Sequence, residues 1–370
     1  MNHRSELASF SLRRLHEPAT QHQTFKILRI AFGVILAFNA LYQMHPAYAK
    51  NLFLASIAAR PGQAAWYVSF TQWVTAGVQF LGAPEVAIAT VVVGVALAVS
   101  MLGGIRVRLF AWVGVIFTML LWITVGHLGG PYTQGATDPG TLIVYALVFV
   151  AILLSEPTER STGLDQVSAG KQEPKRYRSL QIVFGLLWAF DAIWKWTPFF
   201  LHNPQTYLIQ SEAGQPAWIV AYIQFFVDAI GWVGPLTFGI IAALAESVIA
   251  LGLLSGRGMR WVLPFGLVYS FGVWTTAEGW GGPYGSVTGV GGDVLGTTII
   301  YCLVFLYLMV MFAETGTRKS RGVNYLRPFV RDRVLVHAGL PGLEFAWTVR
   351  LYLSARSPNE GMASYPVRNR

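Results

Sequence analysis

Charged residues are scarce in this chain: they make up 12% of its 370 residues, against about 25% in an ordinary soluble protein. So few charges cannot cover a water-soluble globule of this size, and the 54% apolar content excludes intrinsic disorder. Cysteine is almost absent as well. The single Cys302 excludes a disulfide framework, a cysteine zinc ribbon and a cysteine-ligated iron–sulfur cluster. These absences predict an integral membrane protein.

Long apolar runs take the place of the missing charges. Eight runs come close to the roughly 20 residues that cross a bilayer. They lie near residues 27–46, 85–102, 109–126, 140–155, 180–197, 236–255, 261–277 and 294–313. The first run follows a polar stretch and lacks a small-residue cleavage site, so we expect a retained span rather than a signal peptide. The sequence predicts an all-α integral membrane protein with eight transmembrane helices.

Lysine and arginine are unevenly distributed between the loops. If both termini lie on one side, that side receives 24 of the 27 basic residues, and the exceptions are Lys50, Arg60 and Lys195. The positive-inside rule then predicts a multi-pass plasma-membrane protein with cytoplasmic N and C termini. The net charge of +9 is explained by this topology and by contact with anionic membrane lipid. We therefore expect no nucleic-acid partner.

An internal repeat organises the chain. Residues 28–132 align without a gap on residues 180–284, with 29 identities in 105 positions. After a four-residue insertion, Gly140, Tyr145 and Phe149 align with Gly296, Tyr301 and Phe305. Four spans return the chain to its starting side. We therefore expect two tandem four-helix bundles related as a parallel repeat.

The repeat divides the chain into five predicted segments. They are a cytoplasmic N-terminal arm (1–26), a first four-helix membrane repeat (27–156), a charged cytoplasmic linker (157–179), a second repeat (180–314) and a basic cytoplasmic tail (315–370). In each repeat a tryptophan-containing outer segment, 47–84 or 199–235, separates the first two spans. We expect these segments to form helices in the membrane interface.

The two copies differ in their ionisable residues. The first copy has Asn39, Gln43, Gly94, Gly126 and Thr137 where the second has Asp191, Lys195, Glu246, Glu278 and Asp293. Ionisable residues inside a membrane are costly and mark functional sites. We expect the five charged residues to carry the chemistry, with Lys195 attracting an anion and a carboxylate accepting or relaying a proton.

A loop on the outer side completes the predicted substrate site. It contributes Trp280, Gly281, Gly282 and Tyr284, and glycine lets backbone N–H groups approach an anion closely. Structural interpretations stay open, because a loop of this composition also makes a tight turn. Likewise Asp191 and Lys195 can neutralise each other, Glu246 can pair with Lys195 from a neighbouring helix, and Glu278 and Asp293 can order helix ends.

Three histidines offer a competing site. His45, His127 and His202 all fall on the predicted outer side, where imidazoles can bind copper or zinc. Their spacing does not follow an HxxxH pattern. A metal is therefore the weaker interpretation of this end of the molecule.

Short motifs in the second repeat carry a family resemblance. They are Phe184-Gly185, Asp191 and Lys195 in its first span, then Glu246-Ser247, Leu251, Gly256 and Arg260, then Gly281 to Tyr284 with Thr288-Gly289. On these residues the repeat resembles the DoxX superfamily, particularly the DoxD-like membrane subunits of thiosulfate:quinone oxidoreductase. The chain departs from that pattern because it is a tandem of two units, and its tail is too short to be a fused DoxA-like domain.

The resemblance implies a reaction. It implies oxidation of thiosulfate to tetrathionate outside the membrane, electron transfer to membrane quinone, and a second subunit of the DoxA kind. Lys195 and the glycine loop would then bind the anion, and Asp191 or Glu246 would handle protons at the quinone. The alternative is a non-catalytic membrane subunit or a small-solute transporter, in which the charges serve packing or a translocation path.

Overall fold

The computed structural model describes residues 18–130, 139–155, 165–281 and 294–324. Within these ranges the regular elements are helices and there is no strand, which confirms the all-α prediction. The described residues up to Lys319 belong to one compact unit, and those from Ser320 to Asn324 belong to a second. The predicted N-terminal arm lies mostly outside the described residues, and so does the predicted tail beyond residue 324.

The helices follow one another in the same order in both halves. The first half contains α2 (Pro18–Gln43), η1 (Tyr48–Leu52), α3 (Phe53–Ile57), α4 (Ala65–Leu81), α5 (Ala83–Gly103), α6 (Val107–Ile123), η2 (His127–Gly129) and α7 (Thr141–Ser155). The second contains α8 (Asp165–Lys195), α9 (Pro198–His202), α10 (Gln205–Gln210), α11 (Ala217–Val233), α12 (Pro235–Ser255), α13 (Met259–Thr275) and α14 (Thr298–Asn324).

Helix boundaries repeat at the spacing of the sequence repeat. The bounds of α4, α5 and α6 become those of α11, α12 and α13 when 152 is added. The turns repeat as well, because Gly104 and Gly256 both end their helices at φ near +70°. Only glycine adopts this left-handed conformation without strain, so it is the favoured residue at a helix C-terminus. The same glycine at this turn therefore ends α5 and α12 at equivalent positions.

Close helix contacts in each half also depend on glycine. A Cβ atom on Gly266 of α13 would lie 2.1 Å from the ring of Phe305 in α14, and one on Gly114 would lie 2.4 Å from Phe149. These two phenylalanines in turn meet the edges of Phe184 and Phe32, each at 4.9 Å between ring centroids. The aromatic packing in each half therefore requires a glycine, because any side chain at that position would overlap the phenylalanine ring.

The two halves meet through equivalent residues. Thr141 at the start of α7 and Thr297, directly before α14, join their hydroxyl oxygens at 2.6 Å in a buried contact. A bond between equivalent positions is what a twofold relation between two copies produces. One continuous buried apolar cluster contains residues of both halves.

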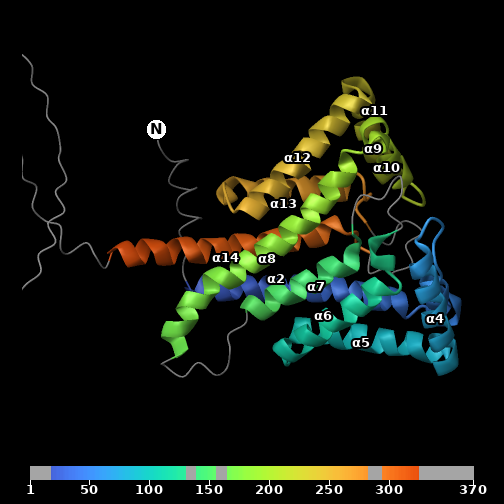
Figure 1. Cartoon of the computed structure of the whole chain (residues 1–370), viewed down its shortest axis with the longest axis horizontal. Coiled ribbons are helices and arrows are strands. Elements are labelled where there is room, and N and C mark those ends of the chain that lie inside the picture. The colour runs from blue at the N-terminus through green and yellow to red at the C-terminus, as the bar shows by residue number, and fades with distance from the viewer. Residues whose placement is uncertain (1–17, 131–138, 156–164, 282–293, 325–370) are drawn as a thin grey trace, which may run out of the picture. The chain divides into compact units, whose positions relative to one another are not determined.

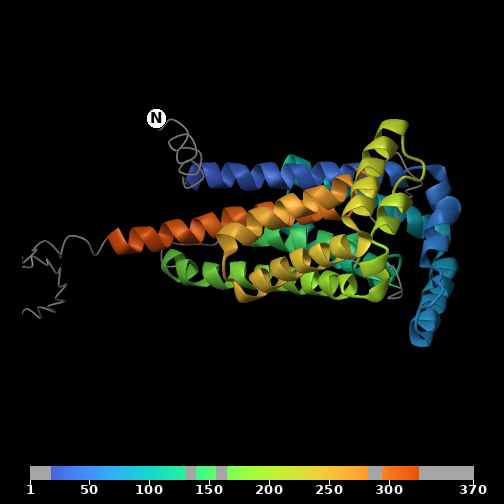
Figure 2. The same ribbon diagram turned by 90° about the horizontal axis from the view of Figure 1, so that it is seen from above.

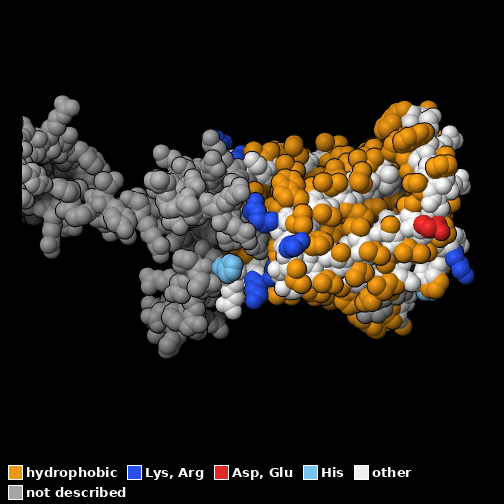
Figure 3. Space-filling model, turned by 90° about the horizontal axis from the view of Figure 1, so that it is seen from below, with side chains coloured by type: hydrophobic (Ala, Val, Ile, Leu, Met, Phe, Trp, Pro, Cys, Tyr) orange, Lys and Arg blue, Asp and Glu red, His pale blue; other side chains and the backbone are white. Residues whose placement is uncertain are grey.

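The short connections gather at two ends of the first compact unit. Figures 1 and 2 show α4, α9, α10 and α11 at one end, which we call the α4/α11 end. Both α2 and α8 begin at the opposite end, and the chain turns there between α5 and α6 and between α12 and α13. Figure 3 shows lysine and arginine side chains near that opposite end and a mainly hydrophobic surface along the helices.

Several described helices are suited to a membrane. Three are long and apolar enough to cross one by length and composition: His22–Gln43 within α2, α5 and α12. Four shorter apolar helices accompany them: Val107–Ile123, Thr141–Ser155, Ala217–Val233 and Thr298–Ala313. Large apolar side chains face outward, among them Trp112, Leu251 and Trp261, each more than half exposed. Monomeric soluble proteins rarely expose such extensive apolar surface.

Two helices extend further than the sequence analysis anticipated. Helix α8 begins at Asp165, inside the predicted linker 157–179, and α14 continues to Asn324, past the predicted end of the second repeat at 314. The α8 extension contains lysine, arginine, glutamine and glutamate, which have high helix propensity, so a helix continues through these polar residues. The sequence gives no comparable reason for the α14 extension, because residues 315–324 include two glycines and two threonines.

A single methyl group tests the glycine contacts. We expect Gly266→Ala to destabilise the protein by about 1–3 kcal/mol, because the new methyl overlaps the Phe305 ring in a packed core. Gly272→Ala is the matched control in the same helix, since a Cβ there meets no atom within 4 Å. Thermal unfolding in detergent, followed by tryptophan fluorescence, measures both. Equal midpoints for the two variants would contradict this packing.

Candidate functional site

The site is built around an ion pair between two helices. Lys195 is the last residue of α8 and Glu246 lies in the middle of α12, which packs along α8. The Lys195 Nζ lies 3.6 Å from Glu246 Oε1, and the two side chains are only 13% and 5% exposed. Of the two open interpretations of Glu246, the structure therefore has the one in which it meets Lys195 from a neighbouring helix.

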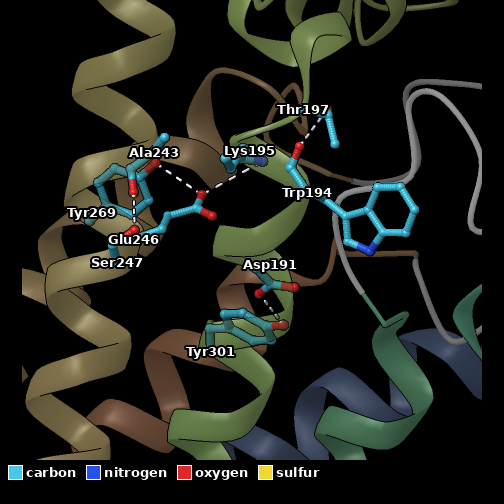
Figure 4. A network of polar contacts seen from close by, with 9 residues as sticks. All are labelled: Asp191, Trp194, Lys195, Thr197, Ala243, Glu246, Ser247, Tyr269 and Tyr301. Carbon is cyan, nitrogen blue, oxygen red and sulfur yellow. Dashed lines mark hydrogen bonds and ion pairs between the residues drawn. The ribbon is translucent and has the colours of Figure 1, made fainter.

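A tyrosine hydroxyl joins the ion pair. Tyr269 of α13 donates a hydrogen bond to Glu246 Oε1 at 3.0 Å. The same carboxylate oxygen thus accepts the hydrogen bond from the tyrosine and forms the ion pair with the lysine, as Figure 4 shows. Such charge-assisted bonds are stronger than bonds between neutral groups. Three helices are tied to one oxygen atom.

Asp191 forms a second carboxylate–tyrosine pair. It lies one helical turn before Lys195 and is 5% exposed. Tyr301 of α14 donates its hydroxyl to Asp191 Oδ2 at 2.9 Å. Figure 4 shows this pair on the same side of α8 as the ion pair. The structure thus brings three of the predicted residues, Asp191, Lys195 and Glu246, into one region.

Aromatic rings cover the lysine from the α4/α11 end. Its Nζ lies 4.5 Å from the ring centroid of Phe200 in α9 and 5.6 Å from that of Tyr207 in α10. Ring faces attract a cation, and more strongly where water is excluded. Burial raises the pKa of Tyr207 to about 12, so this ring stays neutral beside the ammonium group.

Sequence reasoning missed Trp188 and Tyr269. Trp188 of α8 is 2% exposed, and its ring lies 5.9 Å from Tyr269 and 5.3 Å from Tyr301 between centroids. Its indole N–H has no acceptor among the residues that the structure describes. The repeat alignment carried the signal, because the first half has Leu36 and Phe117 at these two positions.

The first half has the same arrangement without charges. Asn39, the counterpart of Asp191, donates to the hydroxyl of Tyr145, the counterpart of Tyr301. Gln43 replaces Lys195, and its amide oxygen lies 3.8 Å from the position of a Cβ on Gly94, the counterpart of Glu246. Three of the positions at which the second half is charged and the first is not, those of Asp191, Lys195 and Glu246, therefore lie close together in the fold.

Glu278 holds a helix end. Its carboxylate accepts hydrogen bonds from the backbone N–H groups of Thr297 and Thr298, at 3.1 and 3.0 Å, and from the Thr298 hydroxyl at 2.8 Å. A negative charge at a helix N-terminus satisfies free N–H groups and the helix dipole. This contact corresponds to the interpretation in which Glu278 orders a helix end. Asp293, also predicted here, lies outside the described residues.

The glycine loop makes a tight turn where it is described. The N–H of Gly281 donates to the Glu278 carbonyl at 2.7 Å, so it is already used within the turn. A Cβ on Gly281 would lie 2.3 Å from the Leu295 carbonyl group, which accepts the indole N–H of Trp274 at 2.7 Å. Trp280 packs its ring on Trp274, at 5.2 Å between centroids. Gly282 and Tyr284 lie outside the described residues.

The three candidate histidines have separate surroundings. His45 Nδ1 accepts the N–H of Ala47 at 3.3 Å, His202 Nδ1 contacts the Pro198 carbonyl at 2.9 Å, and His127 lies against the Tyr67 ring. Within the described ranges, no group of three or more His, Cys, Asp or Glu side chains is arranged to hold a metal ion.

Comparisons with known proteins add no relative. No family model, curated protein or solved structure matches this chain. The resemblance to the DoxX superfamily therefore depends on the motifs quoted above and stays a prediction.

Removing one partner of the buried ion pair should cost more than removing both. We expect Glu246→Gln to destabilise the protein by about 3–5 kcal/mol, because the ammonium group of Lys195 then stays buried without a counter-charge. The double variant Lys195→Gln, Glu246→Gln should recover much of this loss. Thermal unfolding of the purified protein in detergent measures the three stabilities.

Gln43→Met, at the first-half counterpart of Lys195, is the control and should change the unfolding midpoint little. A double variant no more stable than Glu246→Gln would show that the two side chains are not coupled.

Proposed function

We propose that the chain is a DoxD-like subunit of a membrane oxidoreductase that passes electrons from a sulfur anion outside the membrane to membrane quinone. The observation that carries the proposal is the convergence of Trp188, Asp191, Lys195, Glu246 and Tyr269 in one buried region. Each is replaced by a less polar or uncharged residue in the first half. A scaffold would need the same packing in both halves, so a group of adjoining positions that are polar or charged in one half alone supports a site.

The proposed topology has eight spans with both termini in the cytoplasm. The apolar surface of the described helices supports it, and so does the excess of lysine and arginine in the segments assigned to one side. In this orientation the α4/α11 end faces outward. A thiosulfate anion would then approach Lys195 past Phe200 and Tyr207.

The residues near Trp188 suit a quinone. A quinone head group is a flat apolar ring with two carbonyl oxygens, and it needs hydrogen-bond donors in an aromatic environment. The buried indole N–H of Trp188 has no acceptor among the described residues, and the Tyr269 ring lies 5.9 Å from the Trp188 ring between centroids. When bound, the quinone would be the two-electron acceptor of the reaction.

The protein residues have separate tasks in the proposed reaction. Two thiosulfate anions lose one electron each and join through a new sulfur–sulfur bond, and quinone takes up the two electrons and two protons. Lys195 attracts the dianion. The Tyr269–Glu246 and Tyr301–Asp191 pairs hold protons beside the acceptor, where general acids act over hydrogen-bond distances. A DoxA-like second subunit is part of this proposal.

The ion pair itself favours a second candidate, a non-catalytic membrane subunit. Because Lys195 and Glu246 neutralise each other, the cluster also meets the requirement for tolerable charge burial without any ligand. The same charges would line the path of a small-solute transporter. Turnover separates the oxidoreductase from both.

The oxidoreductase predicts turnover that depends on second-half residues. We expect the purified protein, together with its native partner subunit, to reduce a short-chain quinone with thiosulfate. Tyr269→Phe and Lys195→Gln should each lower kcat by about 10²-fold or more, the usual effect of losing a general acid or its electrostatic partner. Quinone absorbance measures the rate.

Tyr145→Phe, the same type of substitution at the first-half counterpart of Tyr301, is the control and should keep its activity. Loss of activity in this variant, or full activity in Tyr269→Phe, would contradict the assignment. A stable complex that gives no turnover with thiosulfate or related sulfur anions would favour the non-catalytic candidate.

The topology predicts which positions are accessible from outside. In a Cys302→Ser background, a membrane-impermeant maleimide should label Lys50→Cys on intact cells. It should label Ser168→Cys only after lysis, because the linker is cytoplasmic in this proposal. Labelling of both positions on intact, impermeable cells would overturn the arrangement of the spans.

A further inference from the structure

The first half carries polar residues of its own that the second half lacks. Arg60, Tyr67 and His127 stand where the second half has Glu212, Ile219 and Gly279. The three first-half residues belong to the loop before α4, to α4 and to η2, all at the α4/α11 end. The second half thus has its own charged residues around Lys195, and the first half has its own polar residues around His127.

His127 occupies an unusual position. It is 3% exposed and has φ of +53°, a conformation that side chains rarely adopt and that Gly279 shares with φ of +55°. One ring nitrogen is hydrogen-bonded to the backbone of Ser56. The other, Nδ1, has no partner in the part of the chain that the structure describes. A strained, buried imidazole with one unused nitrogen is a feature of binding sites rather than of turns.

Arg60 supplies a positive charge beside this imidazole. Its guanidinium donates to the Gly130 carbonyl at 3.3 Å, three residues after His127. The Tyr67 ring lies 6.0 Å from the His127 ring between centroids. The Tyr67 hydroxyl donates a hydrogen bond to the Ile123 carbonyl at 2.6 Å. Burial and then the Arg60 charge lower the pKa of His127, while the Ser56 bond raises it. The net effect keeps the imidazole neutral at neutral pH.

We propose that Arg60 and His127 form a binding site for a tetrahedral oxyanion, either a free anion or the phosphate of a lipid head group. A guanidinium presents paired donors that match such an anion. Protonated Nδ1 would be a third donor. The groups that face His127 are Arg60, the Tyr67 ring and the Ser56 backbone, and the described ones include no carboxylate that would compete with the anion.

Anion binding and protonation of His127 are coupled in this proposal. An anion offsets the Arg60 charge and accepts the new N–H, so it favours the imidazolium form. Affinity therefore increases as the pH falls, by up to about tenfold per pH unit between the pKa values of His127 in the free and bound protein. This site needs no redox chemistry and is independent of the oxidoreductase proposal.

The experiment follows the His127 ring directly. The full chain, labelled with ¹⁵N-histidine, is placed in nanodiscs of phosphatidylcholine, and NMR records the histidine pH titrations. Sulfate, phosphate and thiosulfate are added in turn, with chloride at equal ionic strength as the reference. We expect a saturable rise of at least one unit in the pKa of His127, and His127→Gly identifies its signal. Nanodiscs that contain phosphatidylglycerol test the lipid source.

Matched variants decide the outcome. Arg60→Gln should abolish the rise, whereas Lys50→Gln, the other predicted outer cation of the first half, and Lys195→Gln should keep it. His127→Gly is compatible with the turn, because Gly279 has the same φ in the second half. A rise with soluble anions assigns the site to a free anion, and a rise with phosphatidylglycerol alone assigns it to lipid. No rise in either case, or an equal rise in Arg60→Gln, overturns the proposal.

Discussion

Burial of charge among apolar helices is the constraint on which the second half depends. Taking a single ion from water into such surroundings costs several kcal/mol, so Lys195 and Glu246 are stable there only when they meet. Their 3.6 Å contact requires α8 and α12 to lie close, and Gly185 permits this, because a Cβ on it would lie 3.0 Å from the side chain of Leu253. The charged pair thus depends on the close glycine contact, which the first half also has at Gly33.

Duplication provides an internal reference for separating packing from chemistry. Tyr145 and Tyr301 occur in both halves and bond to the residue at the same position, although that residue is Asn39 in one half and Asp191 in the other. The tyrosine therefore belongs to the shared scaffold. Substitutions between the halves that alter charge but keep the same contact, such as Asn39 for Asp191, mark positions at which the two halves differ in chemistry.

Much of the helix pattern follows from the sequence, because apolar runs and glycine turns are local signals. The bounds of α5, α6 and α7 lie within a few residues of the predicted spans. The partners of the charged residues are not local. Glu278 could not be assigned to the N-terminus of α14, nor Tyr269 to Glu246, since residues far apart in sequence carry no mark of their contact. In sequence Trp188 resembles any other core aromatic, because the lack of an acceptor for its indole N–H among the described residues is a property of the fold.

The hydrogen bond between Thr141 and Thr297 has a consequence for how such a chain can evolve. Two copies that touch through the same residue form the kind of interface found in a homodimer. In a homodimer every substitution appears twice, so a buried lysine in one subunit is a buried lysine in both. Fusion into one polypeptide removes that restriction and fixes the stoichiometry at one of each. A substitution in one half is then inherited without its counterpart in the other, so each half can gain or lose a charge alone.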